Sequence, residues 1–311
     1  MMASWLSLVR PEPTPSTAKG PLSPRDLVTP MPSRRVRVSG MDINTIDSGE
    51  RDGTPVVFLH GLSAWMDFWR LQLAPVAEKR RVLALDLPGY GSSDAPDAPY
   101  TPSWFADIVV AWLDSLGVEQ VDIVAHSMGG QVALNLAARF PDRVRRLVLS
   151  APAGFEQFVP AAASVMKAYW TRDRAQQSKE PAIRTNFNTA VFARNDSHVE
   201  LLVEQRVRIG LHPLFYNTSR AVSRSVAGML DEPVFEQLSQ VHAPTLVVFG
   251  GRDTLIPNRV FTRSTTRQVA DDGIAQLPNA HLCWLDTAGH TAHHDDPTGF
   301  NRAMMRFLET P

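Results

Sequence analysis

Short apolar runs that end in glycine, serine or aspartate recur along most of the chain, with amphipathic segments between them. Runs rich in Val, Ile and Leu predict strands that are buried on both faces. The apolar stripe from Ser103 to Leu116 has helical spacing, and Gly117 ends it. The expected strands cover residues 35–39, 43–47, 55–59, 81–86, 121–126, 144–150, 244–249 and 280–285.

The order of these segments predicts the architecture. Residues 35–47 read as a hairpin, and strands then alternate with helices from residue 55 onwards. Such alternation is typical of a mostly parallel sheet with right-handed crossovers. Ligands of such sheets bind at the carboxyl ends of the strands. The fold class expected is therefore α/β, with a mostly parallel central sheet flanked by helices.

The sharpest change of pattern is at Ser127. Strand 121–126 stops there, and an Ala-rich segment with helical spacing follows at once. A serine at such a turn lifts its hydroxyl above the sheet edge, and N–H groups at the start of the helix can face a developing negative charge. The turn needs small residues two places before and two places after the serine, and Ala125 and Gly129 meet that need.

The sequence Ala-His-Ser-Met-Gly resembles the Gly-x-Ser-x-Gly nucleophile motif of the α/β hydrolases, with Ala125 in place of the first glycine. The resemblance covers about residues 35–309. It includes Asp253, on the loop after strand 244–249, and His290, after strand 280–285. It implies that Ser127 is the nucleophile, His290 the general base and then acid, and Asp253 the group that orients His290.

The same resemblance implies an oxyanion hole and a catalytic machinery that needs no cofactor and no metal. His60 and Gly61 follow the third strand, where the family places half of the hole. The two donors would be the backbone N–H groups of Leu62 and Met128. His60 is expected to shape its own loop, and His126 is expected to point away from Ser127.

Three other sets of polar residues compete for a role in the chemistry. Asp86 ends a strand, but the Pro-Gly-x-Gly-x-Ser sequence that follows predicts a shaped loop held by this carboxylate. His293 and His294 precede two aspartates, and a solvated loop is the preferred interpretation over a weak cation site. Asp231 and Glu232 follow no strand and therefore rank below Asp253 as the acid.

The strand pattern is interrupted once. Residues 151–240 read as mainly helical and rich in aromatic side chains, which matches the helical cap or lid that the family inserts after the sixth strand. We expect a hydrolase core made of residues 34–150 and 241–311. Residues 1–33 are rich in Pro, Ser and Thr, and we expect a flexible N-terminal extension there. The apolar residues between Trp5 and Val9 offer a short docking anchor.

Composition excludes several classes of function. A charged content of 20% with a net charge of −1 gives no basic field for nucleic acid or an anionic membrane. The single cysteine, Cys283, lies in an apolar run and is expected to be a buried structural thiol, so no internal disulfide exists. No apolar run is long enough for a transmembrane segment, and the start of the chain makes a poor signal peptide. A cytoplasmic location is the default expectation, and the oligomeric state is open.

The function expected is cleavage of a carboxylic ester, carboxylesterase- or lipase-like, with an acyl-serine intermediate and an apolar small-molecule substrate. Epoxide and haloalkane chemistry is disfavoured, because those family members carry Asp where this chain has Ser127. Carbon–carbon hydrolysis of acidic dienols ranks lower, because the loop 60–65 holds no Arg or Lys for a carboxylate. Acyl transfer, perhydrolysis, amide cleavage and a non-catalytic binding role remain as alternatives.

Overall fold

The centre of the molecule is an eight-stranded sheet with the strand order β1-β2-β4-β3-β5-β6-β7-β8. The structure, a computed structural model, describes residues 20–309. β2 pairs antiparallel with both β1 and β4, and every later pair is parallel, which confirms the expected sheet. The strands are β1 (Ser33–Val38), β2 (Met41–Asp47), β3 (Val56–Leu59), β4 (Val82–Leu85), β5 (Val121–His126), β6 (Val144–Ser150), β7 (Thr245–Gly250) and β8 (Ala280–Leu285).

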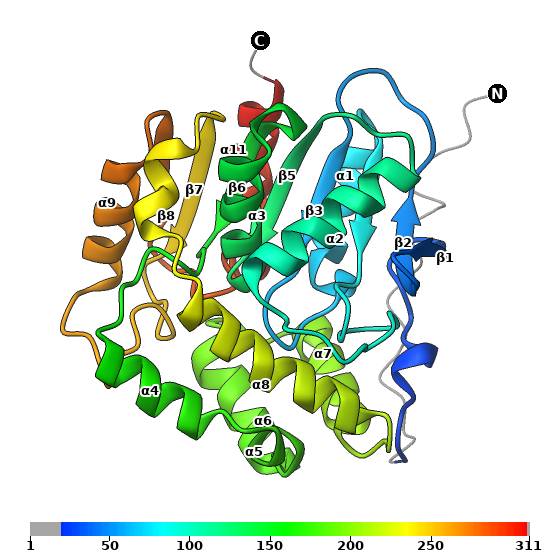
Figure 1. The fold of residues 1–311 in the computed structure, drawn as a ribbon, viewed down its shortest axis with the longest axis vertical. Coiled ribbons are helices and arrows are strands. Elements are labelled where there is room, and N and C mark those ends of the chain that lie inside the picture. Colours follow the sequence, from blue (N-terminus) through cyan, green and yellow to red (C-terminus); the bar gives the residue numbers. More distant parts are fainter. Residues whose placement is uncertain (1–19, 310–311) are drawn as a thin grey trace.

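Helices cover both faces of this sheet (Figure 1). β3 explains why the strands are apolar throughout: Val57 and Leu59 enter one core, and Val56 and Phe58 enter the other. The first core also includes side chains of α2 (Pro102–Ser115), α3 (Met128–Arg139) and α9 (Thr266–Gln276). The second core includes side chains of α1 (Arg70–Ala77) and α11 (Pro297–Glu309). The short helical turns are η2 (Pro24–Asp26), η3 (Met66–Trp69), η4 (Pro141–Arg143), η6 (Phe235–Gln240) and α10 (Ala292–Asp295). In the described part of the chain, no helix is both long and apolar enough to cross a membrane.

Between β6 and β7 the chain leaves the sheet and forms a group of helices, which we call the inserted helices. Figure 1 shows them gathered at one end of the strands, below the sheet in this view. They are α4 (Pro160–Tyr169), α5 (Arg172–Gln176), α6 (Glu180–Asn186), the π-helical turn η5 (Phe187–Val191), α7 (Ser197–Gly210) and α8 (Phe215–Asp231). α6 and α7 build a third apolar cluster, and Trp65 and Phe68 from the loop after β3 pack into it.

The segment before β1 is packed on the body of the protein rather than extended from it. Met31 is 2% exposed and joins the core beside α1 and α11, while Leu27 packs among the inserted helices. The Ser92 hydroxyl donates to the Pro24 carbonyl, and Arg25 pairs with Asp94. The expected flexible extension is therefore wrong for residues 20–33, because Leu27 and Met31 of this segment are buried. Residues 1–19, with the expected anchor between Trp5 and Val9, lie outside the described part.

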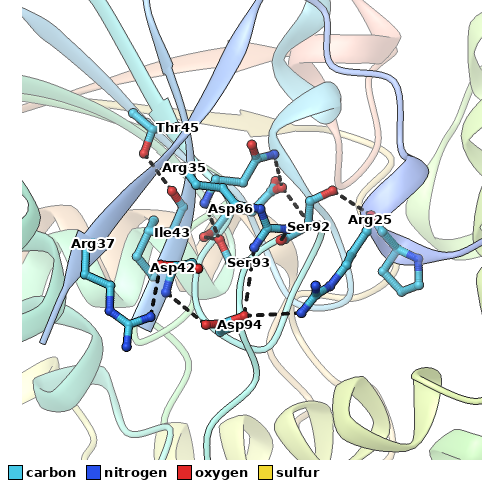
Figure 2. A network of polar contacts seen from close by, with 12 residues as sticks. Arg25, Arg35, Arg37, Asp42, Ile43, Thr45, Asp86, Ser92, Ser93 and Asp94 are labelled. Carbon is cyan, nitrogen blue, oxygen red and sulfur yellow. Dashed lines mark hydrogen bonds and ion pairs between the residues drawn. The ribbon is translucent and has the colours of Figure 1, made fainter. Parts of the chain in front are cut away.

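Figure 2 shows the network that shapes the loop after β4. Asp86 accepts hydrogen bonds from the backbone N–H groups of Met66 and Ser92 and from the Asn44 side chain, at 2.8 to 2.9 Å. Asp94 closes the same loop by accepting from the Asp42 N–H. The expected structural role of Asp86 is therefore confirmed. Burial raises the pKa of its carboxyl, and the three donors oppose that shift.

Candidate active site

Ser127 occupies a strained turn between β5 and α3. Its φ of 51° and ψ of −117° are unusual for a residue with a side chain, and the backbone holds them on both sides. The Ser127 N–H donates to the Ser150 carbonyl, and the N–H of Ala153 donates to the Ser127 carbonyl. Gly129 makes this turn possible, because a Cβ there would lie 2.6 Å from the His60 carbonyl oxygen. The turn therefore brings α3 against the end of β3.

The structure brings together the three side chains that the sequence singled out. The Ser127 Oγ lies 3.0 Å from His290 Nε2, and His290 Nδ1 lies 2.9 Å from Asp253 Oδ2. His290 and Asp253 are 5% and 1% exposed, so water does not compete for the bond between them. This geometry lets Ser127 pass a proton to Nε2 while the carboxylate holds the Nδ1 proton.

Asp253 is held in place by its own loop. Its Oδ1 accepts from the N–H groups of Leu255 and Ile256, at 2.8 and 3.0 Å, which leaves Oδ2 for His290. Gly250 ends β7, and a Cβ at this position would lie 2.3 Å from two carbonyl oxygens of the loop before His290. The acid loop and the histidine loop are thus packed backbone to backbone.

The loop after β3 reaches the nucleophile from the other side. A Cβ on Gly61 would lie 3.2 Å from the Ser127 Cβ, so this loop passes directly over the turn. In the turns and loops of residues 20–309, neither the Leu62 nor the Met128 N–H donates to a backbone oxygen. Their role as the two donors of an oxyanion hole stays a prediction. His60 shapes the loop as expected, since it accepts from the Leu87 N–H at 2.9 Å and lies 2.8 Å from the Gly61 carbonyl.

His293 and His294 do not lie on a solvated loop, as the sequence suggested. They belong to the short helix α10 and are 0% and 3% exposed. His294 bonds the Phe68 carbonyl, and His293 stacks on Trp69 with ring centroids 4.2 Å apart. Aromatic packing on the face that α1 covers explains their burial. No group of three or more metal-ligating side chains placed to hold an ion occurs in residues 20–309.

A second serine and histidine pair lies behind the first. The Ser150 Oγ is 3.2 Å from His293 Nδ1. Both residues are fully buried, and Ser150 ends β6 without a following helix. A nucleophile must be reachable by its substrate, so this pair serves the packing of the core.

Sequence reasoning missed Arg206, which lies on α7. Its guanidinium is buried, stacks 4.5 Å from the ring centroid of Phe215, and lines a cavity of about 20 Å³. Its Nη1 has no hydrogen-bond partner in residues 20–309. Burial lowers the pKa of Arg206 to about 10, so the group stays charged at neutral pH. The cavity also touches Ser63 and Ala64, which follow the Leu62 loop.

The remaining candidates have structural partners. Asp231 pairs with Lys167 at 2.6 Å on the surface, and Glu232 accepts from the N–H and hydroxyl of Ser103. Cys283 is only partly buried, and burial raises the pKa of its thiol, which reduces its reactivity.

Comparison with known proteins shows the family of this chain. A family model described as the alpha/beta hydrolase fold matches residues 54–297. The chain belongs to the α/β hydrolases. This α/β hydrolase is 33% identical to a 2-hydroxymuconate semialdehyde hydrolase from a Pseudomonas species, over 90% of this chain and 95% of that one. It is 36% identical to a 2-hydroxy-6-oxo-2,4-heptadienoate hydrolase from Pseudomonas putida, over 88% and 95%.

Solved structures share the fold of this α/β hydrolase at lower identity. A probable hydrolytic enzyme from Pseudomonas aeruginosa superposes with a TM-score of 0.83 at 23% identity, over 94% of this chain and 99% of that one. An enol-lactonase from Burkholderia xenovorans superposes with a TM-score of 0.72 at 21% identity, over 89% and 100%.

Proposed function

We propose that this α/β hydrolase cleaves a carboxylic ester through an acyl-Ser127 intermediate. The observation that carries the proposal is the unbroken set of hydrogen bonds from Ser127 through His290 to Asp253. A neutral serine hydroxyl is a weak nucleophile at pH 7, and it needs a base that a third group orients. The nucleophile Ser127, the base His290 and the orienting acid Asp253 lie together, at or just after the carboxyl ends of β5, β8 and β7.

The reaction proceeds in two halves. In the first, Ser127 Oγ bonds to the ester carbonyl carbon while its proton moves to His290 Nε2. The Leu62 and Met128 N–H groups receive the oxyanion, and the leaving alkoxide takes the proton from His290 as the carbon–oxygen bond breaks. In the second half, His290 Nε2 takes a proton from water as the water oxygen bonds to the acyl carbon. The bond from that carbon to Ser127 Oγ then breaks, Oγ takes the proton back from His290, and the carboxylic acid leaves.

The inserted helices are proposed to form the lid over this site and to select the substrate. Among their side chains that line the cavity, Ile209 and Phe215 are apolar, and an apolar acyl or alcohol part fits against them, while Thr218 and Arg206 are polar. The buried guanidinium adds a preference for a substrate that also carries a carboxylate. The cavity has room for about one water molecule. A carboxylate therefore reaches Arg206 only when the surrounding segments move apart.

A second candidate is hydrolysis of a carbon–carbon bond next to a ketone or aldehyde carbonyl in an acidic dienol. The names of the two relatives support it, since both denote acids with such a bond. Arg206 also supplies the cation that the loop 60–65 lacks. Ester cleavage ranks first because an alkoxide leaves with the single proton that His290 carries. A carbon leaving group must first be stabilised as an enol or enolate, and that requires a further proton transfer.

Parallel assays of wild-type protein and Ser127→Ala test both candidates. p-Nitrophenyl esters from acetyl to palmitoyl probe ester cleavage, and a 2-hydroxy-6-oxodienoate probes carbon–carbon cleavage. We expect ester turnover that falls by roughly 10⁴ to 10⁶ in kcat in the alanine variant. Near-normal turnover in that variant would defeat the Ser127 assignment. Turnover of the dienoate alone would replace the ester proposal with the second candidate.

A further inference from the structure

His126 is a buried polar side chain that the reaction described above does not use. It precedes Ser127 at the end of β5 and is 4% exposed. Its ring lies behind the nucleophile, 4.9 Å from the ring of His290 and 4.8 Å from the ring of His293. Burial of a histidine in this position costs desolvation free energy, and a small apolar residue at the end of the strand would avoid that cost.

One nitrogen of His126 is bonded to the histidine loop. Nε2 lies 3.1 Å from the carbonyl oxygen of His290. A carbonyl only accepts, so Nε2 carries the proton and donates it. Burial, with the neighbouring histidine His290 next in effect, holds the pKa of His126 well below its usual value, so the ring stays neutral. This hydrogen bond therefore fixes the backbone of His290, whose side chain faces Ser127.

The other nitrogen of His126 faces the loop on the opposite side. A Cβ built on Gly61 would lie 2.7 Å from His126 Nδ1 and 3.2 Å from the Ser127 Cβ. The ring thus fills the space beneath the backbone that leads to the Leu62 N–H. One side chain contacts the loop with the proposed oxyanion donor and the loop with the proposed base, and it is covalently next to the nucleophile.

We propose that His126 is a positioning residue, which sets the spacing of the Gly61 loop and the His290 loop about Ser127 by one hydrogen bond and one ring contact. This inference rests on the proposed serine mechanism. Reacting groups must be held close to their productive geometry, and a misplacement of about 1 Å can cost a factor of about 100 in rate. Removal of the Nε2 donor should therefore reduce kcat and leave KM nearly unchanged.

A matched pair of variants isolates the hydrogen bond. His126→Gln keeps an N–H donor of similar reach, and His126→Met keeps the length of the side chain without a donor. Two readouts apply to both: kcat and KM for p-nitrophenyl acetate, and the rate of stoichiometric p-nitrophenolate release from diethyl p-nitrophenyl phosphate. The phosphotriester reports the reactivity of Ser127 directly, and Ser127→Ala is the blank. Thermal unfolding checks that each variant is folded.

We expect kcat of the methionine variant to fall roughly tenfold below that of the glutamine variant, with KM within about twofold and phosphorylation slowed in parallel. Equal kcat values in the two folded variants, or a change in KM without a change in kcat, would overturn the positioning role of His126. Neither result would contradict the proposed function. A wild-type protein inert to both reagents would overturn the proposed function and this inference with it.

A second variant serves if the methionine variant does not fold. Gly61→Ala places a methyl group against the His126 ring and the Ser127 Cβ from the other side. We expect kcat to fall by roughly tenfold or more, because the His126 ring must shift away from the His290 carbonyl. Wild-type kcat in a folded Gly61→Ala protein would show that the ring contact does not position the site.

Discussion

The turn around Ser127 and the inserted helices are built in opposite ways. At the turn, backbone groups bond one another across four loops, and glycines allow contacts closer than any side chain permits. The inserted helices meet the rest of the protein largely through individual side chains. Trp65 and Phe68 pack into the cluster built by α6 and α7, Ala221 of α8 enters the first core, and the Asp295 carboxylate accepts from the N–H groups of Ala193 and Arg194. Most of the large apolar side chains exposed in residues 20–309 also lie on or beside them: Val159, Val165, Tyr169, Trp170, Leu211, Leu214 and Tyr216.

Under the proposed function, this difference separates the catalytic chemistry from the selection of the substrate. A site that transfers a proton between fixed atoms gains from rigidity, and close backbone packing supplies it. A cover that must admit and release substrate gains from contacts that break one at a time. Substitutions near the turn should therefore change kcat, and substitutions among the inserted helices should change KM and substrate preference.

The largest effect is expected at Asp253. Asp253→Asn keeps the shape of the side chain but cannot hold the Nδ1 proton of His290 in the same way, so Nε2 no longer serves as the base. We expect kcat to fall by about 10⁴, with little change in KM, in ester assays at neutral pH. Asp231→Asn, on the surface at the end of α8, is the matched control. A loss of less than tenfold would remove Asp253 from the proposed mechanism.

Acid should destabilise the rigid region strongly. Burial lowers the pKa of His60 to about 4 and that of His294 to about 3, and it holds those of His126 and His293 well below 6.5. Between pH 6.5 and about 4 the unfolded chain therefore binds protons that the folded protein does not. The free energy of unfolding should fall as the pH drops through this window, by up to about 1.4 kcal/mol per pH unit for each histidine.

Urea unfolding at pH 7.5 and pH 5.0 measures this acid sensitivity. His294→Gln keeps a donor for the Phe68 carbonyl and removes one titrating group, so its loss of stability on acidification should be smaller. The exposed His281 supplies the control, His281→Gln, whose pH dependence should match the wild type. Equal stability of the wild-type protein at both pH values would contradict the expectation of neutral buried rings.

A substitution of Arg206 tests whether the inserted helices recognise a substrate carboxylate. Arg206→Met keeps the apolar stem of the side chain and removes the charge. A hydrogen bond to a charged group contributes about 1.5 to 3 kcal/mol, so KM for a p-nitrophenyl monoester of succinate should rise by roughly 10- to 100-fold. KM for neutral p-nitrophenyl butyrate should stay within about threefold. An equal rise for both esters would mean that Arg206 supports packing against Phe215 rather than recognition.

The smallest effect is expected on the outer face of α4. Val165 is 55% exposed, and Val165→Ser removes no buried contact. Stability should change by less than about 0.5 kcal/mol, and kcat and KM for short esters should stay within twofold. A selective loss on long-chain esters would instead place this face in contact with the substrate.

Much of this arrangement follows from local pattern. Ser127 directly follows its apolar run, and Asp253 and His290 lie on the loops just after theirs. Parallel strands bring their carboxyl ends to one side of a sheet, so the proximity of the three residues was predictable. Asp86 was predictable for a similar reason, because a carboxylate before a Gly-rich loop has backbone N–H groups to bind. The helix from 103 to 116 was found from its period, within one residue of α2.

The features that sequence reasoning missed depend on packing between distant segments. Arg206 lies on a helix with charged neighbours, and nothing in its spacing shows that Phe215 buries it. His293 and His294 looked solvated beside two aspartates, yet Trp69 and Phe68, far along the chain, enclose them. Leu27 and Met31 looked like part of a polar extension, because single apolar residues among prolines carry no period.

The match to the family model begins at residue 54, yet the cavity beside Arg206 has Pro24 in its wall. Part of the surface proposed to bind the substrate thus comes from outside the region that the family model matches. A lineage that lengthened, shortened or replaced this leading segment would remodel the pocket without a single substitution near Ser127. The front of the chain is therefore a place where new substrate preferences can arise while the chemistry stays as it is.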